Sequence, residues 1–149
     1  WNPIHQVKND PEIEIPIIGN GDITSAETAM HRLEEGPLDG LMIGRGAIGN
    51  PWLFAQCRAL LEGKPLPPEP GLAERARICE AHLRMAVDHK GERTGMLEMR
   101  KHYKPYFKGL LNLKQQKLRL LTSDSIQEVL EILQEMQHSQ PENNLPTCR

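Results

Sequence analysis

Two short apolar runs, each leading into a glycine-rich loop, constrain the fold of this chain more than any other feature. IPIIG, residues 15–19, leads into G-N-G-D at 19–22, and GLMIG, residues 40–44, leads into G-R-G at 44–46. Short apolar runs that end in glycine are typical of buried strands. The helical apolar spacing of the segment between them makes a parallel β-α-β unit the expected structure.

Each strand is expected to lead into a helix with its own start signal. TSAETAMHRLEEG opens with Thr24 and Glu27, which fit a capping box. WLFAQCRALLE follows Asn50 and Pro51, which fit the cap and the first position of a second helix.

Gly44, Gly46 and Gly49 also spell G-x-G-x-x-G, the fingerprint of dinucleotide-binding domains. That hypothesis requires a further strand that ends in an acidic residue about 20 positions beyond the glycines. The corresponding place falls near Glu69, in a proline-rich segment, and no strand pattern follows it. The sequence therefore disfavours a Rossmann domain for nicotinamide binding.

The two glycine loops instead suit a phosphate site shared by neighbouring strands. The carboxyl ends of parallel strands meet at one edge, where loop N–H groups and helix N-termini attract anions. Arg45 adds a cation that can contact phosphate oxygens with two N–H groups. The last two strands of an eight-stranded α/β barrel carry such a site. The alternative is that the glycines only form tight turns and helix ends.

A proline-rich segment divides the chain into two expected domains. KPLPPEPG, residues 64–71, has four prolines in eight residues and is expected to be a stiff linker. Residues 1–63 form the expected α/β part, and residues 72–137 have the helical spacing of a bundle. Residues 138–149 have little to bury, and we expect them to be a disordered tail.

Residues 100–119 carry seven Lys or Arg and no Asp or Glu, although the whole chain has a net charge of −2. Such a basic stretch with interleaved aromatic side chains suits an RNA backbone and its unpaired bases. The alternative is an ordinary solvated helix face. Three of the cations, Arg100, Lys104 and Lys108, recur every fourth residue and would share one helix face if the helix continues through Pro105. The four candidate RNA contacts are Arg100, Lys101, Lys104 and Lys108.

Composition sets further limits on the class of protein. Hydrophobic residues make up 38 % and charged residues 26 %, and no apolar run approaches the roughly 20 residues of a membrane span. The three cysteines form no C-x-x-C pair, so we expect no metal site, no disulfide framework and a reducing, cytoplasmic setting. The chain begins at Trp1 without a signal-peptide pattern, and we expect it to be part of a longer protein.

The run IPIIGNGDITSAETAMHRLEEGPLDGLMIGRGAIGNPWLF resembles the tRNA-dihydrouridine synthases. WNPIHQVKNDPEI before it and GMLEMRKHYKPYFKG after it resemble the same family, so the resemblance covers about residues 1–121. It implies an α/β fold: the C-terminal fragment of a TIM (β/α)8 barrel, followed by an all-α helical-bundle domain that grips tRNA. It also implies a flavoprotein, in which NADPH reduces FMN and the flavin reduces the C5–C6 bond of particular uridines in tRNA.

The resemblance assigns the FMN phosphate site to Asn20, Gly21 and Asp22, and Gly44 and Arg45 complete it. Asp22 is expected to contribute only its backbone, because a carboxylate is an unfavourable neighbour for a phosphate dianion. The family's general acid is a cysteine earlier in the barrel, and none of the three cysteines here matches it. No catalytic residue is therefore expected in this chain, which alone should be inactive.

Two other functions stay open from the sequence. One is a stand-alone RNA-binding helical module with a vestigial α/β part. The other is an FMN-barrel oxidoreductase that acts on small molecules. The basic, acid-free stretch argues against the second, because a small substrate gives no reason for it.

Overall fold

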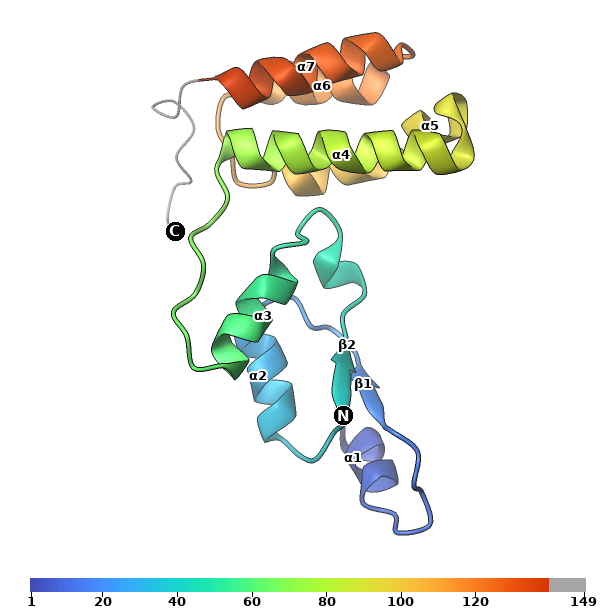
Figure 1. Ribbon diagram of the computed structural model, residues 1–149, viewed down its shortest axis with the longest axis vertical. Helices are drawn as coiled ribbons and strands as arrows, with labels where there is room; N and C mark the ends of the chain where they lie inside the picture. The colour runs from blue at the N-terminus through green and yellow to red at the C-terminus, as the bar shows by residue number, and fades with distance from the viewer. Residues whose placement is uncertain (140–149) are drawn as a thin grey trace. The chain divides into compact units, whose positions relative to one another are not determined.

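The computed structural model describes residues 1–139, in which two compact units are present (Figure 1). The first unit is Trp1–Pro68 and the second begins at Glu69, so the division falls inside the proline-rich segment. No helix in the described part of the chain is long and apolar enough to cross a membrane. The described residues also contain no group of three or more His, Cys, Asp or Glu that could hold a metal ion.

The first unit is a β-α-β unit with one flanking helix at each end. Its strands pair in parallel, with Ile18 opposite Gly40 and Asn20 opposite Met42. A parallel pair needs a crossover connection, and a helix supplies it here, which confirms the predicted β-α-β order. The elements are α1 (Asn2–Lys8), β1 (Ile18–Asn20), α2 (Ala26–Glu34), β2 (Gly40–Met42), the 3-10 turn η1 (Arg45–Ala47) and α3 (Leu53–Leu61).

The first strand starts later than the apolar run at 15–19 suggested. Pro16 has no N–H to donate to a ladder. The next amide, of Ile17, donates to the Asp39 carboxylate at 2.7 Å. Pairing with the neighbouring strand therefore begins only at Ile18. The second strand begins at Gly40 as expected and ends two residues early, at Met42.

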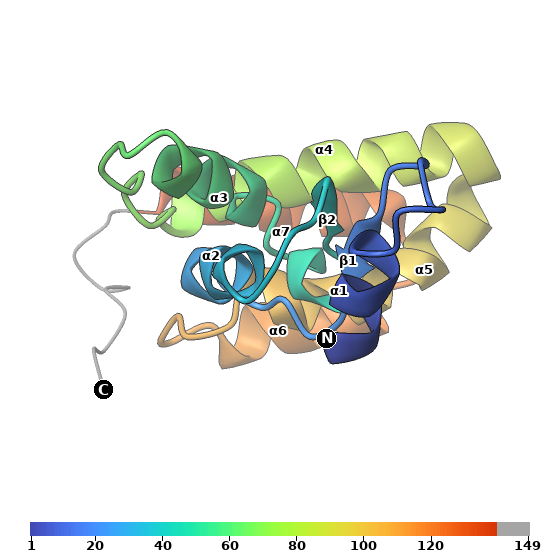
Figure 2. The same ribbon diagram turned by 90° about the horizontal axis from the view of Figure 1, so that it is seen from below.

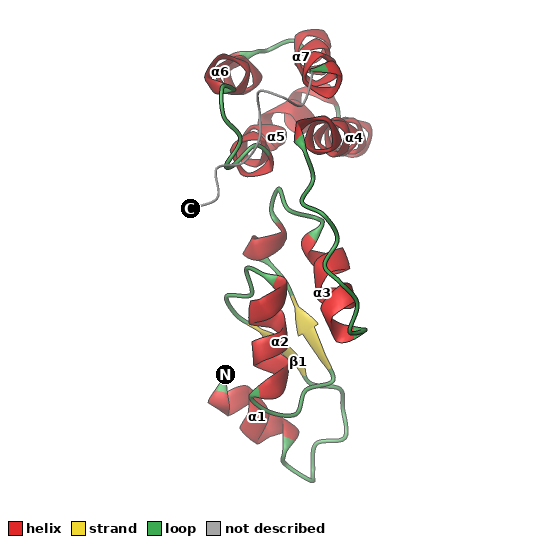
Figure 3. Cartoon of the chain, turned by 90° about the vertical axis from the view of Figure 1, so that its left-hand side faces the viewer, coloured by secondary structure: helices red, strands yellow, loops and turns green. Residues whose placement is uncertain are grey.

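Both predicted helix starts in this unit were displaced. The cap of α2 is Ser25 and not Thr24, because the Ser25 hydroxyl accepts a hydrogen bond from the Thr28 amide at 3.1 Å. The third helix begins at Leu53, because the residues from Asn50 form a turn in which the Leu53 amide donates to the Asn50 carbonyl at 3.3 Å. Figure 3 shows α2 and α3 lying alongside the two strands.

The second unit is a bundle of four helices in the described residues. Viewed end-on in Figure 3, the helices occupy the corners of a square, and α4 spans the length of the bundle in Figure 2. Neighbours in this square pack against each other: α4 with α5 and α7, and α6 with α5 and α7. The helices are α4 (Leu72–Lys90), α5 (Glu92–Tyr106), α6 (Lys114–Thr122) and α7 (Ile126–His138).

The core of the bundle can be compared with two apolar stripes that helical spacing in the sequence predicts. One comprises Leu72, Ala76, Cys79, Leu83 and Val87, and the other Ile126, Val129, Leu130 and Leu133. On α4 the predicted stripe is buried from Leu72 to Leu83, and Val87 is half-buried. On α7, Val129 and Leu133 are buried as predicted, whereas Ile126 and Leu130 are only half-buried. Ile132 and Met136 are buried in addition. The predicted disordered tail lies almost wholly outside the described residues, which end at Ser139.

Candidate phosphate site and basic helix face

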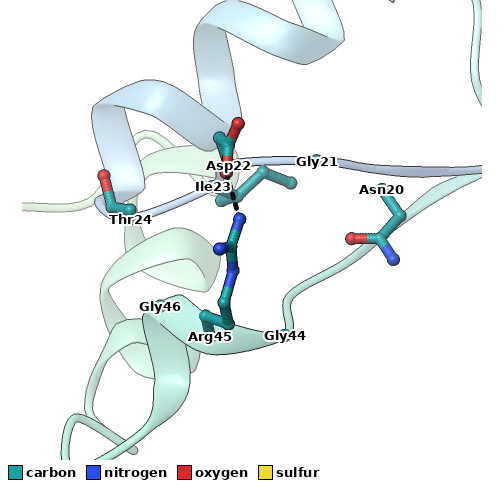
Figure 4. Close-up of a pocket in the computed structure, with 8 residues that line it drawn as sticks. All are labelled: Asn20, Gly21, Asp22, Ile23, Thr24, Gly44, Arg45 and Gly46. Atoms are coloured by element: carbon teal, nitrogen blue, oxygen red, sulfur yellow. Dashed lines mark hydrogen bonds and ion pairs between the residues drawn. The ribbon is translucent and has the colours of Figure 1, made fainter.

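The two glycine-rich loops line one pocket of about 650 Å³ (Figure 4). The parallel pairing of β1 and β2 brings the loops together, because both loops leave the same edge of the sheet. All five residues assigned to the cofactor phosphate line this pocket, so the structure places them side by side. The lining residues are Asn20, Gly21, Asp22, Ile23 and Thr24 from the first loop and Gly44, Arg45 and Gly46 from the second.

Glycine is required where these loops approach each other. A Cβ atom on Gly46 would overlap the carbonyl oxygen of Ile23. In the first loop, Gly21 has a φ of 145° and Asp22 a φ of 50°, both on the side of the backbone map that most side chains avoid. The close approach of the loops therefore depends on glycine at position 46, and the turn of the first loop on a positive φ at Gly21 and Asp22.

Arg45 extends across the pocket and pairs with Asp22 (Figure 4). The distance between Arg45 Nη2 and Asp22 Oδ1 is 2.7 Å, and the two side chains are 86 % and 78 % exposed. Asp22 thus has a side-chain contact that the sequence prediction did not include. Exposed ion pairs contribute only about 0–1 kcal/mol, so a phosphate group can exchange for this carboxylate at little cost.

The rest of the pocket offers further groups to an anion. Asn20 ends β1, and its Nδ2 makes a single, long contact within residues 1–139, donating to Met42 Sδ at 3.5 Å. Helix α2 begins at Ala26, immediately after the first loop, and the N-terminal end of a helix carries a partial positive charge. Amides, one guanidinium and a helix N-terminus together favour an anionic ligand.

Two of the three cysteines lie in the described residues. Cys57, on α3, is half-buried, and burial together with the charge of Glu27 raises the pKa of its thiol. Cys79, on α4, is buried, and burial raises the pKa of its thiol strongly. Cys148 falls outside the described residues. No described cysteine lines the pocket of the two glycine loops.

The basic stretch divides at the end of α5. Arg100, Lys101 and Lys104 lie on the helix, whereas Lys108 lies beyond its last residue, Tyr106. The prediction that Lys108 shares the face of Arg100 and Lys104 was wrong. Pro105 is accommodated in the last turn, and the chain then leaves the helix toward Gly109, whose φ is 81°.

Arg100 has a partly structural environment that the sequence did not reveal. Its Nη2 donates to the Ser123 carbonyl at 3.1 Å and to Asp124 Oδ1 at 2.8 Å. Arg93 lies seven residues before Arg100 and therefore on the same face of α5. Sequence reasoning missed Arg93, because Glu98 separates it from the acid-free stretch. The seven-residue spacing between Arg93 and Arg100 was the signal that could have found it.

Comparison with known proteins identifies relatives. The family model Dihydrouridine synthase (Dus) matches residues 1–143. A probable tRNA-dihydrouridine synthase of Mycobacterium leprae is 42 % identical over 109 residues, which cover 73 % of this chain and 28 % of that protein.

Two further relatives give the same family. A probable tRNA-dihydrouridine synthase of Rickettsia bellii is 39 % identical over 112 residues, covering 75 % of this chain and 34 % of that protein. tRNA-dihydrouridine synthase B of Pasteurella multocida is 40 % identical over 99 residues, which cover 66 % of this chain and 30 % of that protein. The chain thus spans about a third of the length of these curated relatives. With a family model that matches nearly all of it, this chain belongs to the dihydrouridine synthase family.

Proposed function

We propose that this chain is part of a cytoplasmic tRNA-dihydrouridine synthase, in which it binds the phosphate of FMN and part of the tRNA. NADPH is the proposed reductant. The observation that carries the proposal is the convergence of the two glycine loops and Arg45 on one pocket. Family membership supports the reaction, and it disfavours the alternative of an oxidoreductase for small molecules.

The pocket fits the phosphate end of a flavin mononucleotide. It has room for the group, at about 650 Å³, and the glycines leave the backbone accessible to phosphate oxygens. Arg45 would neutralise part of the phosphate charge, and its release from Asp22 costs little because both side chains are exposed. The chain's own task here is to hold and orient the cofactor.

When bound, the flavin would supply the reducing equivalent for the C5–C6 bond of uracil. The described residues bring no cysteine to the pocket, so the proton donor is expected from another part of the enzyme. On this basis, the chain by itself is expected to be inactive. The chain would contribute by binding and orienting the flavin and the tRNA, so that their reaction takes place within one complex and not between free molecules.

We further propose that β1 and β2 are the last two strands of a TIM barrel. Support comes from apolar side chains that the first unit leaves in solvent: Ile15 is 68 % exposed, Ile18 48 % and Met42 55 %. Parallel sheets are normally covered on both faces. The remaining strands of a barrel would cover these side chains and pair with the free strand edges.

FMN retention by the full-length enzyme tests the phosphate assignment. Replacing Arg45 by Ala removes a charge-assisted contact, which contributes about 1.5–3 kcal/mol, so FMN affinity should fall about ten- to a hundredfold. The matched variant Asp22→Asn keeps a residue that tolerates a positive φ but removes the competing carboxylate, and should bind FMN more tightly. An Arg45→Ala enzyme that keeps its flavin through dilution as well as the parent does would contradict the proposal.

A further inference from the structure

A second hollow, separate from the phosphate pocket, lies beside the N-terminal half of α5. Its volume is about 500 Å³. One of its walls comes from the α6–α7 loop, which contributes Asp124, and the others come from α5 itself. The lining residues are Glu92, Arg93, Met96, Leu97, Arg100 and Asp124.

The outward face of α5 places an apolar side chain among cations. Arg93, Leu97, Arg100 and Lys104 follow one another at spacings of four, three and four residues, which aligns them along one helix face. Lys101 lies beside them. Leu97 is 49 % exposed, although it lies in the middle of these four basic side chains. A single exposed leucine is ordinary, but this one is part of the floor of a hollow.

The two arginines of the hollow differ in how they are held. Arg100 is oriented by its bonds to the Ser123 carbonyl and to Asp124, both made through Nη2. A guanidinium has five N–H donors, so Arg100 keeps donors for a ligand. Arg93 is exposed, and its side chain makes no hydrogen bond or ion pair with any other residue in 1–139. The acids in the hollow are Glu92 and Asp124, and Arg100 neutralises the latter.

We propose that this hollow receives one unpaired nucleotide of the bound RNA. Arg93 and Arg100 would contact its phosphate, and the exposed Leu97 would contact its base or ribose. The proposal rests on the proposed binding of tRNA by α5. Cations alone suit a phosphate backbone, but an apolar floor between them suits a ligand with both a phosphate and an uncharged flat group. Base faces are accessible only where RNA is unpaired, and the volume lies within the range of small-ligand pockets.

Titration of the 149-residue chain with fluorescently labelled tRNA, at several salt concentrations, tests this assignment. Arg93→Ala should weaken binding about tenfold and reduce the salt slope by about 0.7–0.9, as expected for one lost phosphate contact. Leu97→Ala should weaken binding about three- to tenfold, because it removes methyl groups that the bound nucleotide would cover, and should leave the salt slope unchanged. The matched controls are Arg77→Ala and Met85→Ala on α4, which remove an exposed cation and an exposed apolar side chain.

The same titrations separate failure of this inference from failure of the broader proposal. If Arg93→Ala and Leu97→Ala both bind like the parent while Lys101→Ala with Lys104→Ala weakens binding, the hollow is not a nucleotide site and the basic face remains. If none of these changes alters RNA binding, the proposed role of α5 fails as well. Single-stranded RNA should show the Leu97 effect and a duplex should not; an equal loss with both would overturn the assignment to an unpaired nucleotide.

Discussion

Replacing Gly95 by Ala tests how closely α4 and α5 approach each other beneath the basic face. A Cβ atom at this buried position would lie 2.7 Å from the Val87 nitrogen, 2.8 Å from the Val87 Cα and 2.9 Å from the Ala86 carbonyl carbon. All three are backbone atoms of α4, so no side-chain rotation relieves the overlap. The two helices must separate, and the packing between them must weaken.

Two opposing effects determine the sign of the change in stability. Ala is the better helix former, which stabilises an interior position by about 0.5–1 kcal/mol relative to Gly. Overpacking costs about 1–3 kcal/mol, and contact with backbone places this site toward the upper end. We therefore expect a net loss of about 1–2 kcal/mol, or a melting temperature lower by roughly 5–15 °C for a unit of this size.

Thermal unfolding followed by circular dichroism at 222 nm measures the effect. Thr94→Ala is the matched control, because Thr94 is the exposed neighbour on the same helix and should gain only helix propensity. Gly95→Ala should unfold at a lower temperature than the parent, and Thr94→Ala at the same or a slightly higher one. A rise in melting temperature for Gly95→Ala would mean that propensity prevails and that the helices are not in close contact there.

Two further predictions concern the helical unit. Burial and the charge of Lys101 lower the pKa of His82, and burial, His82 and Lys101 lower that of His102. In the unfolded chain the histidine pKa is near 6.5, so below that pH the unfolded state binds more protons than the folded state. The free energy of unfolding should therefore fall as the pH decreases from about 7 toward the lower pKa values of the folded state. The urea midpoint should be lower at pH 5.5 than at pH 7.5, and this difference should be smaller in His102→Gln. Leu133→Ala, at a fully buried core position, should lower the free energy of unfolding in urea by about 2–5 kcal/mol. Leu118→Ala, at a position that is 60 % exposed, should change it by no more than about 0.5 kcal/mol, and equal losses in the two variants would contradict the described packing.

The pocket between the two glycine loops could be predicted from the sequence because its determinants are local. Each glycine loop directly follows its own strand, and the parallel pairing of neighbouring strands brings the loops together without further information. The ion pair between Arg45 and Asp22 was not predicted, because 23 residues separate the partners and its formation depends on loop geometry. Likewise, the late start of β1 depends on Asp39, 22 residues away from the amide of Ile17.

The basic face was only partly predictable for a different reason. Counting charges along the chain found Arg100 but excluded Arg93, because Glu98 lies between them and ends the acid-free run. On the helix, however, Glu98 lies on a different side from Arg93 and Arg100. The bond from Arg100 to Asp124 joins residues 24 apart and depends on how α5 packs beside the α6–α7 loop. Lys108 was placed on the face by extending helical spacing past Tyr106, where the helix ends.

The most direct test of the central claim, a phosphate site formed by the two glycine loops, is a comparison of FMN with riboflavin by amide NMR of this chain. The two ligands differ only in the phosphate group. FMN and inorganic phosphate should shift the same amide signals, those of Gly21, Asp22, Gly44 and Arg45, and riboflavin should leave them in place. Equal shifts with riboflavin, or FMN shifts confined to other residues, would contradict a phosphate site at these loops.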